Sequence, residues 1–190
     1  MVFHEIISMG PGPCRLKVPR RGRSSRLIRH GMSPHSPHTV SETMLMAVRR
    51  AAVKYRMNIS MHVAETKDEL SLLRGNASGL DRLYTAAGWD RAWAPRARSS
   101  FEYLGRLGIL GPKFLAVHAV HADDADIAII KCSGAGIAHC PRSNRALGVG
   151  KMQLAKFLKS GISVGLGTDS LASAPSLSLW DEMRFAYRIH

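Results

Sequence analysis

The chain has 190 residues, of which 45% are hydrophobic, and this composition suits a globular unit with a core of its own. No run of about 18 apolar residues occurs, so we expect no membrane span. The apolar run at the start of the chain is interrupted by His4 and Glu5, so this segment does not resemble a signal peptide. The three cysteines form no CxxC pair, which favours reduced thiols in a cytoplasmic protein over a disulfide framework.

The net charge of +13 comes from 27 basic and 14 acidic residues. Much of the excess lies in residues 9–30, a Gly-, Pro- and Arg-rich segment with seven basic residues and no acid. This segment holds no aromatic residue on which a base could stack, which speaks against nucleic acid as the partner. Three readings stay open: a solvated, flexible insertion, a polyanion-binding arm, or a segment foreign to the fold. Its composition predicts mobility.

Short apolar runs alternate with helical patterns along the chain. The runs are continuous rather than alternating, which is typical of parallel strands covered on both faces. Strands are predicted at 2–8, 28–34, 58–64, 113–118, 135–139 and 162–167. Helices are predicted at 41–56, 66–74, 99–107, 123–133, 151–160 and 177–188. This alternation predicts an α/β fold with a parallel sheet.

Polar side chains gather where the predicted strands end. They are His35, His62, Glu65, His118, His121, His139, Asn144 and Asp169. In parallel α/β sheets and barrels, the carboxyl ends of the strands form the active-site face. Because packing alone does not require polar groups at five strand ends, the pattern predicts a functional site on that face.

The motifs "PHSPHT", "HVAET", "VHAVH", "HCPRSN" and "GTDSLAS", in this order, resemble the amidohydrolase superfamily. They look most like its deaminase and chlorohydrolase branch, which includes adenosine-type, S-adenosylhomocysteine, aminofutalosine, guanine and triazine hydrolases. The resemblance implies an incomplete (β/α)8 TIM barrel with five to six of its eight strands. Residues 1–8 would be one barrel strand, and 31–190 would be the C-terminal part of the barrel, with 9–30 inserted between them.

The resemblance also implies one divalent metal, with zinc the first choice and iron the alternative. His62 and Asp169 would be metal ligands, and Glu65 would be the acid/base that protonates a ring nitrogen of the substrate. Asp169 would also be catalytic, because it could accept the proton of the water while Glu65 returns one to the leaving amine. His118 would lie beside the metal-bound water and polarise the attacked centre, and His35 would contact the substrate. Imidazole and carboxylate ligands suit zinc, and a hydrophobic surrounding would help to keep Glu65 partly protonated.

Other polar residues in these motifs are expected to support the fold. His121 and His139 are interpreted as structural residues or as residues that support the ligands. Asn144 is expected to organise the loop after its strand, and Cys140 to be a small buried hydrophobic residue.

Three positions depart from the family pattern. The His-any-His motif of the first barrel strand is absent from the chain. His62 and Asp169 alone would leave a metal under-coordinated, so the sequence predicts weak zinc binding. His38 stands where the family usually has an aromatic residue, and Ala174 stands where an Asn is common.

The function predicted from the resemblance is metal-dependent hydrolysis of non-peptide carbon–nitrogen bonds. The expected substrate is a small amino-substituted nitrogen heterocycle or nucleoside, which would release ammonia. Two alternatives stay open: a catalytically inactive remnant of the family, or a basic protein that binds polyanions through residues 9–30. A homo-oligomer is compatible with all of these readings.

Overall fold

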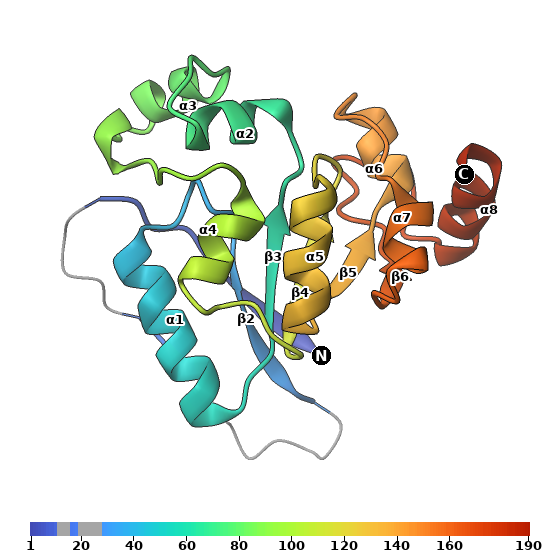
Figure 1. Cartoon of the computed structure of the whole chain (residues 1–190), viewed down its shortest axis with the longest axis horizontal. Helices are drawn as coiled ribbons and strands as arrows, with labels where there is room; N and C mark the ends of the chain where they lie inside the picture. The colour runs from blue at the N-terminus through green and yellow to red at the C-terminus, as the bar shows by residue number, and fades with distance from the viewer. Residues whose placement is uncertain (11–15, 19–27) are drawn as a thin grey trace.

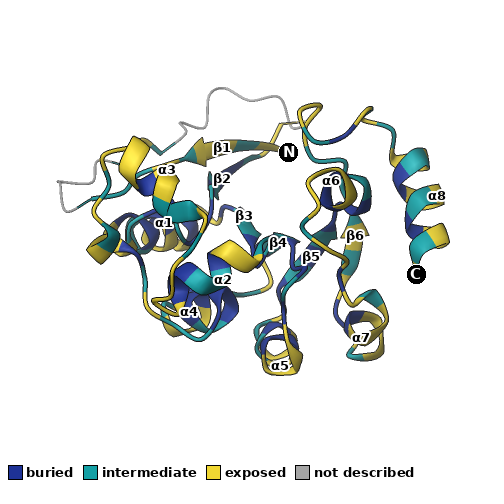
Figure 2. Ribbon diagram, turned by 90° about the horizontal axis from the view of Figure 1, so that it is seen from above, coloured by how far each residue is buried: buried dark blue, intermediate teal, exposed yellow. Residues whose placement is uncertain are grey.

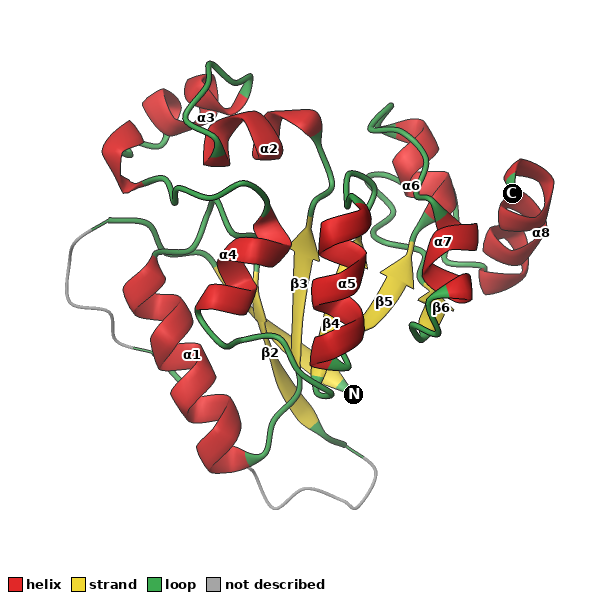
Figure 3. Cartoon of the chain, viewed as in Figure 1, coloured by secondary structure: helices red, strands yellow, loops and turns green. Residues whose placement is uncertain are grey.

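The computed structural model describes residues 1–10, 16–18 and 28–190. It contains one six-stranded sheet in which the strands lie side by side in the order of the sequence (Figures 1 and 3). The strands are β1 (Val2–Ile6), β2 (His30–Pro34), β3 (Ile59–Val63), β4 (Phe114–His118), β5 (Gly136–His139) and β6 (Val164–Leu166).

All neighbouring strands of this sheet are parallel. The register places His62 beside Val117 and Val63 beside His118, so β3 and β4 end at the same level. The carboxyl ends of the strands therefore form one edge of the sheet, as the sequence predicted. The described residues supply six of the eight strands of a (β/α)8 barrel.

From β2 onward, helices alternate with the strands, as a parallel sheet requires. They are α1 (Glu42–Tyr55), α2 (Lys67–Leu73), α3 (Leu80–Ala86), α4 (Ser100–Arg106), α5 (Asp124–Ser133), α6 (Pro141–Ala146), α7 (Leu154–Lys159) and α8 (Leu179–Ile189). A 3-10 turn, η1 (Arg91–Trp93), precedes α4. Helices α1, α4, α5 and α7 lie along one face of the sheet, whereas α2, α3 and α6 lie beyond the carboxyl ends of the strands (Figure 1).

The six predicted helices are present, with bounds that differ by up to three residues at each end, but α3 and α6 were not predicted. Helix α6 has only six residues and begins with Pro141 directly after β5. A proline is well tolerated in the first helical turn, but without a side-chain cap the sequence "CPRSN" is also typical of a loop. Helix α3 is similarly short and lacks a side-chain cap.

The core lies between the sheet and the helices that cover it. Met61, Ala116 and Ile137 come from three adjacent strands and are at most 1% exposed. They belong to one cluster with Leu45 of α1 and Ile130 of α5. In Figure 2 the buried residues follow the strands and the sides of the helices that face them. This buried layer packs the sheet against its helices and so fixes where the strands end.

The basic segment 9–30 lies largely outside the described residues, and so does the prediction that it is mobile. Of its described part, Leu16 and Val18 are partly buried and pack against the main core. His30 begins β2.

None of the helices in the described ranges has both the length and the apolar character to cross a membrane.

Candidate active site

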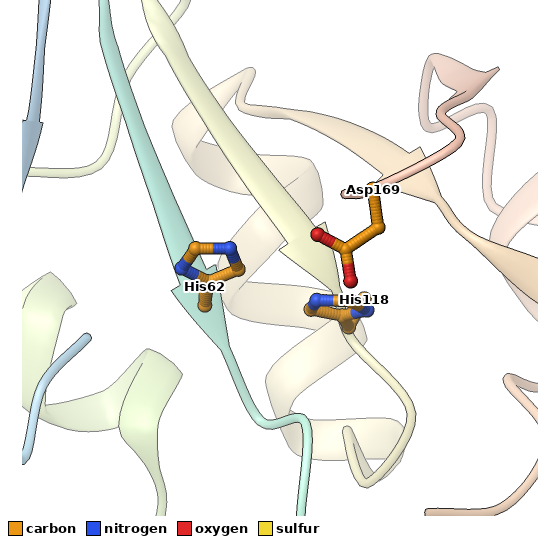
Figure 4. A group of neighbouring side chains, drawn as sticks. All are labelled: His62, His118 and Asp169. Atoms are coloured by element: carbon orange, nitrogen blue, oxygen red, sulfur yellow. The ribbon is translucent and has the colours of Figure 1, made fainter. Parts of the chain in front are cut away.

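Three side chains that could bind a metal converge at the carboxyl edge of the sheet (Figure 4). His62 comes from the end of β3, His118 is the last residue of β4, and Asp169 follows β6. Each offers one ligand atom, and these atoms lie within 4.8 Å of one another. Two imidazoles and a carboxylate form a donor set typical of catalytic zinc, which takes three protein ligands and keeps one position open.

Hydrogen bonds to Nδ1 orient the rings of His62 and His118, and they leave Nε2 of each ring free to bind a metal. Nδ1 of His62 is 2.9 Å from the carbonyl oxygen of His35 and must donate to it. Nδ1 of His118 is 2.8 Å from Oδ1 of Asn144, which also accepts only. Nε2 of His118 is buried without a hydrogen-bond partner in the described part of the chain. A bound metal would satisfy this orphaned nitrogen, so these residues fit the ion that the family resemblance implies.

Asp169 is held as a carboxylate by two serine hydroxyls. Ser143 and Ser173 both donate to its Oδ2, at 2.6 and 2.8 Å. Burial by itself would raise the pKa of Asp169, but these two hydrogen bonds, together with His118 and the backbone N–H of Ser170, hold the pKa below the usual value. Asp169 therefore stays ionised near neutral pH, as a metal ligand must be.

Glu65 lies next to these three residues, and its pKa is shifted in the opposite direction to that of Asp169. Its Oε1 is 3.5 Å from Nε2 of His118, and its side chain is 22% exposed. Burial raises the pKa of Glu65, and the nearby charge of Glu69 adds to this, although His62 opposes it. A carboxyl group with a raised pKa can carry a proton closer to neutral pH, which suits an acid/base role.

The backbone is strained where these residues leave their strands. Ala64, His118, Ala119 and Asp169 have φ values of 53°, 75°, 48° and 59°. This left-handed region costs a residue with a Cβ about 1 kcal/mol or more, and such strain clusters at functional sites. Among the described non-glycine residues, only Arg56 shares it, at the C-terminal cap of α1.

The structure brings His62, Glu65, His118 and Asp169 together, as expected from the sequence. It also adds His118 to the possible metal ligands, whereas the sequence predicted only His62 and Asp169 in that role. The count of candidate protein ligands thus rises from two to three, but the His-any-His pair is still absent from the chain, so weak zinc binding stays a prediction.

The ring of His35 lies beside the site, 5.1 Å from the ring of His62. Its Nδ1 is hydrogen-bonded to Thr39 Oγ1 at 2.8 Å, and its carbonyl oxygen holds His62. The sequence predicted a substrate contact for the side chain and did not predict this role of the backbone.

The two other strand-end histidines have partners away from the ligand group. Nε2 of His121 donates to the carbonyl oxygen of Val149 at 2.9 Å. Nε2 of His139 is 3.1 Å from Nε2 of His190. Cys140 is buried, as expected.

Sequence reasoning missed the partners of the ligands. Asn144 was expected to organise a loop, but it lies in α6 and binds His118. Ser143 and Ser173 were not singled out. Their position in the motifs "HCPRSN" and "GTDSLAS" was the available signal, because both motifs follow strands that end at the site.

Comparison with known proteins gives the same family. The amidohydrolase family model matches residues 17–190. The chain is 36% identical over 157 residues to the 5-methylthioadenosine/S-adenosylhomocysteine deaminase of Pelotomaculum thermopropionicum, which covers 83% of this chain and 32% of that protein.

Two solved structures share the fold. The aminofutalosine deaminase of Helicobacter pylori has a TM-score of 0.78 and 25% identity, over 88% of this chain and 42% of its own. An adenosine deaminase of Xanthomonas campestris with bound zinc has a TM-score of 0.68 and 26% identity, over 86% of this chain and 33% of its own.

The chain spans about a third of the length of the curated relatives that it matches. The family match covers nearly all of the chain and includes the three strand ends that carry the candidate ligands. The motifs, the parallel sheet and this match agree: the chain belongs to the amidohydrolase family.

Proposed function

We propose that this site performs metal-dependent hydrolytic deamination of an adenine-type nucleoside. The observation that carries the proposal is the convergence of His62, His118 and Asp169 at one strand edge with Glu65 beside them. The similar deaminases support the choice of reaction, and the zinc in the Xanthomonas structure supports the choice of metal.

In this proposal Nε2 of His62, Nε2 of His118 and the carboxylate of Asp169 hold one divalent ion, zinc in the first instance. The ion would supply Lewis acidity and make a water molecule nucleophilic near neutral pH. The chain contributes the orientation of the ligands, because Asn144 and the His35 carbonyl fix the two rings.

Glu65 serves as the general acid. Its raised pKa lets it carry a proton to a ring nitrogen of the substrate, which makes the amino-bearing carbon more electrophilic. Asp169 has the lower pKa of the two and is ionised, so it accepts the proton of the attacking water. It then passes this proton to the amino group, which leaves as ammonia. The remaining hydroxyl proton returns to Glu65 as the carbonyl of the product forms. The two carboxyl groups thus divide the acid and base roles through their different surroundings.

The substrate class follows from the relatives rather than from the pocket. S-adenosylhomocysteine and 5-methylthioadenosine are the substrates named for the Pelotomaculum protein. We therefore propose an adenine nucleoside with a substituent at the 5′ position. The ring of His35 lies at the edge of the site, where it can contact such a substrate.

The test measures ammonia release from these two nucleosides by the zinc-loaded chain. Glu65→Gln should remove most of the turnover, because Gln can hydrogen-bond but cannot transfer a proton, and general acid–base catalysis is typically worth about 10²–10⁴-fold. Metal content should be unchanged in this variant. Glu42→Gln, an exposed change in α1, is the matched control and should keep the parental rate.

Two outcomes would contradict the proposal. The first is a fully metal-loaded chain that releases no ammonia from either nucleoside. The second is near-parental turnover in Glu65→Gln, which would leave the metal group standing but remove the acid/base role of Glu65.

A further inference from the structure

Glu69 is an ionisable residue that the proposed reaction does not use. It lies in the first turn of α2 and is 1% exposed. Within the described ranges it forms no ion pair with Lys, Arg or His. Burial of a carboxylate is costly unless hydrogen bonds compensate for it, so the contacts of Glu69 call for an explanation.

Both oxygens of Glu69 accept hydrogen bonds from the segment that carries Glu65. Oε1 accepts from the backbone N–H of Ala64 at 2.8 Å, and Oε2 accepts from the backbone N–H of Glu65 at 3.0 Å. The hydroxyl of Ser100, at the start of α4, donates to Oε1 as well. One buried carboxylate thus ties the end of β3 to two helices.

This arrangement differs from an ordinary helix cap. Thr66 and Glu69 have the spacing of a capping box, and the Thr66 hydroxyl accepts from the N–H of Glu69 at 3.0 Å. In a capping box the glutamate would return to the N–H of the cap residue itself. Glu69 instead reaches one and two residues further back, to Glu65 and Ala64.

The two N–H groups converge on Glu69 because Ala64 has a φ of 53°. This left-handed conformation is unfavourable for alanine and persists only where surrounding contacts enforce it. It turns the chain sharply between His62 on the strand and Glu65 beside His118. The hydrogen bonds of Glu69 therefore hold the turn that sets the direction of the Glu65 side chain.

We propose that Glu69 is a positioning residue: its buried carboxylate clamps the Ala64–Glu65 backbone and so places the Glu65 carboxyl beside the candidate metal ligands, 3.5 Å from Nε2 of His118. The inference rests on the proposed function for its catalytic consequence. A glutamine cannot replace this clamp, because its NH2 group would face one of the two N–H donors.

The test compares Glu69→Gln with Glu102→Gln in the full chain. Glu102 is a matched control, because its Oε2 accepts from the backbone N–H of Arg98 at 2.7 Å and its own N–H donates to the cap residue Ser99. Glu102 thus forms the same type of hydrogen bonds at the N-terminus of α4, away from the candidate metal ligands. Urea unfolding of both variants shows how much each change costs in stability.

Glu69→Gln should lower kcat for nucleoside deamination by about 10–100-fold with little change in KM, since loss of a supporting contact typically has this size. Amide hydrogen exchange at Ala64 and Glu65 should speed up at least tenfold. Glu102→Gln should leave kcat and both amides unchanged. Parental kcat in Glu69→Gln, or parental exchange at both amides, would overturn the proposal.

Two further arms keep the outcome decisive. Should Glu69→Gln fail to fold, Ser100→Ala keeps the carboxylate but removes one donor, and unchanged exchange at Ala64 in this variant would count against the clamp. If the parent chain shows no turnover, the proposed reaction is refuted, but the proposed role of Glu69 can still be tested. The clamp is then judged by exchange and by the Glu65 to His118 distance in crystals of parent and Glu69→Gln, where an unchanged distance overturns it.

Discussion

Asn144 accepts a hydrogen bond from Nδ1 of His118 at 2.8 Å, although the two residues are 26 positions apart in the chain. The contact joins α6 to the end of β4 and leaves Nε2 of His118 facing Glu65. It fixes the tautomer of a buried ring, and both residues are at most 2% exposed. The contact thus orients a strand-end histidine that could serve as a metal ligand.

Asn144→Ala should therefore weaken metal binding without unfolding the chain. The ring of His118 would lose its hydrogen-bond partner at Nδ1 and could present either nitrogen to the ion. Loss of such a supporting contact typically costs about 10–100-fold in metal affinity or activity. Competition with a zinc-binding dye measures the affinity. Asn76→Ala, an exposed change, is the control, and equal affinities in the two variants would contradict the role of Asn144.

The two possible roles of His118 can be separated by metal analysis of His62→Ala and His118→Ala. If His118 is a ligand, both variants should lose zinc to a similar extent, because each leaves only two protein ligands. If His118 only lies beside the attacking water, His118→Ala should keep its zinc and lose turnover alone. Zinc per chain after dialysis, together with ammonia release, distinguishes these outcomes.

The sheet and the strand ends could be predicted because buried parallel strands leave a strong local signal. Continuous apolar runs such as 113–118 end in a polar residue, and the structure confirms each of the six strands. The hydrogen-bond partners could not be predicted in the same way. Asn144 and Ser143 reach the site only because α6 follows β5 without a loop, and a six-residue helix that starts with Pro141 has little periodicity to detect.

Acid should destabilise the fold through His139, which is fully buried. Burial, with the nearby His190 and His118, lowers its pKa to about 4. In the unfolded chain the group binds a proton below about pH 6.5, whereas in the folded chain it stays neutral down to about pH 4. Stability should therefore fall as the pH drops from 6.5 to 4, by up to ~3 kcal/mol from this residue, and level off below.

Urea unfolding between pH 4 and 7.5 tests this expectation on the parent and on His139→Phe. The variant should lose part of the slope on the acid side, whatever its stability at pH 7.5. His38, whose pKa burial also lowers to about 4, should keep part of the slope in both proteins. Parallel curves for parent and variant would show that His139 does not titrate differently in the two states.

The strain at Ala64 gives a last prediction, because Arg56 offers the same conformation away from the site. Their φ values are 53° and 54°. Glycine adopts this conformation without steric cost but loses more entropy on folding, so each change to Gly should stabilise the chain by about 1 kcal/mol or less. Arg56→Gly, at the C-terminal cap of α1, should keep the parental turnover. Ala64→Gly should instead lower kcat, because a glycine lets the turn between His62 and Glu65 sample other conformations. Urea unfolding and ammonia release on the same two variants decide the matter. If Ala64→Gly were as active as Arg56→Gly, the strain would be a by-product of the fold and would have no part in placing Glu65.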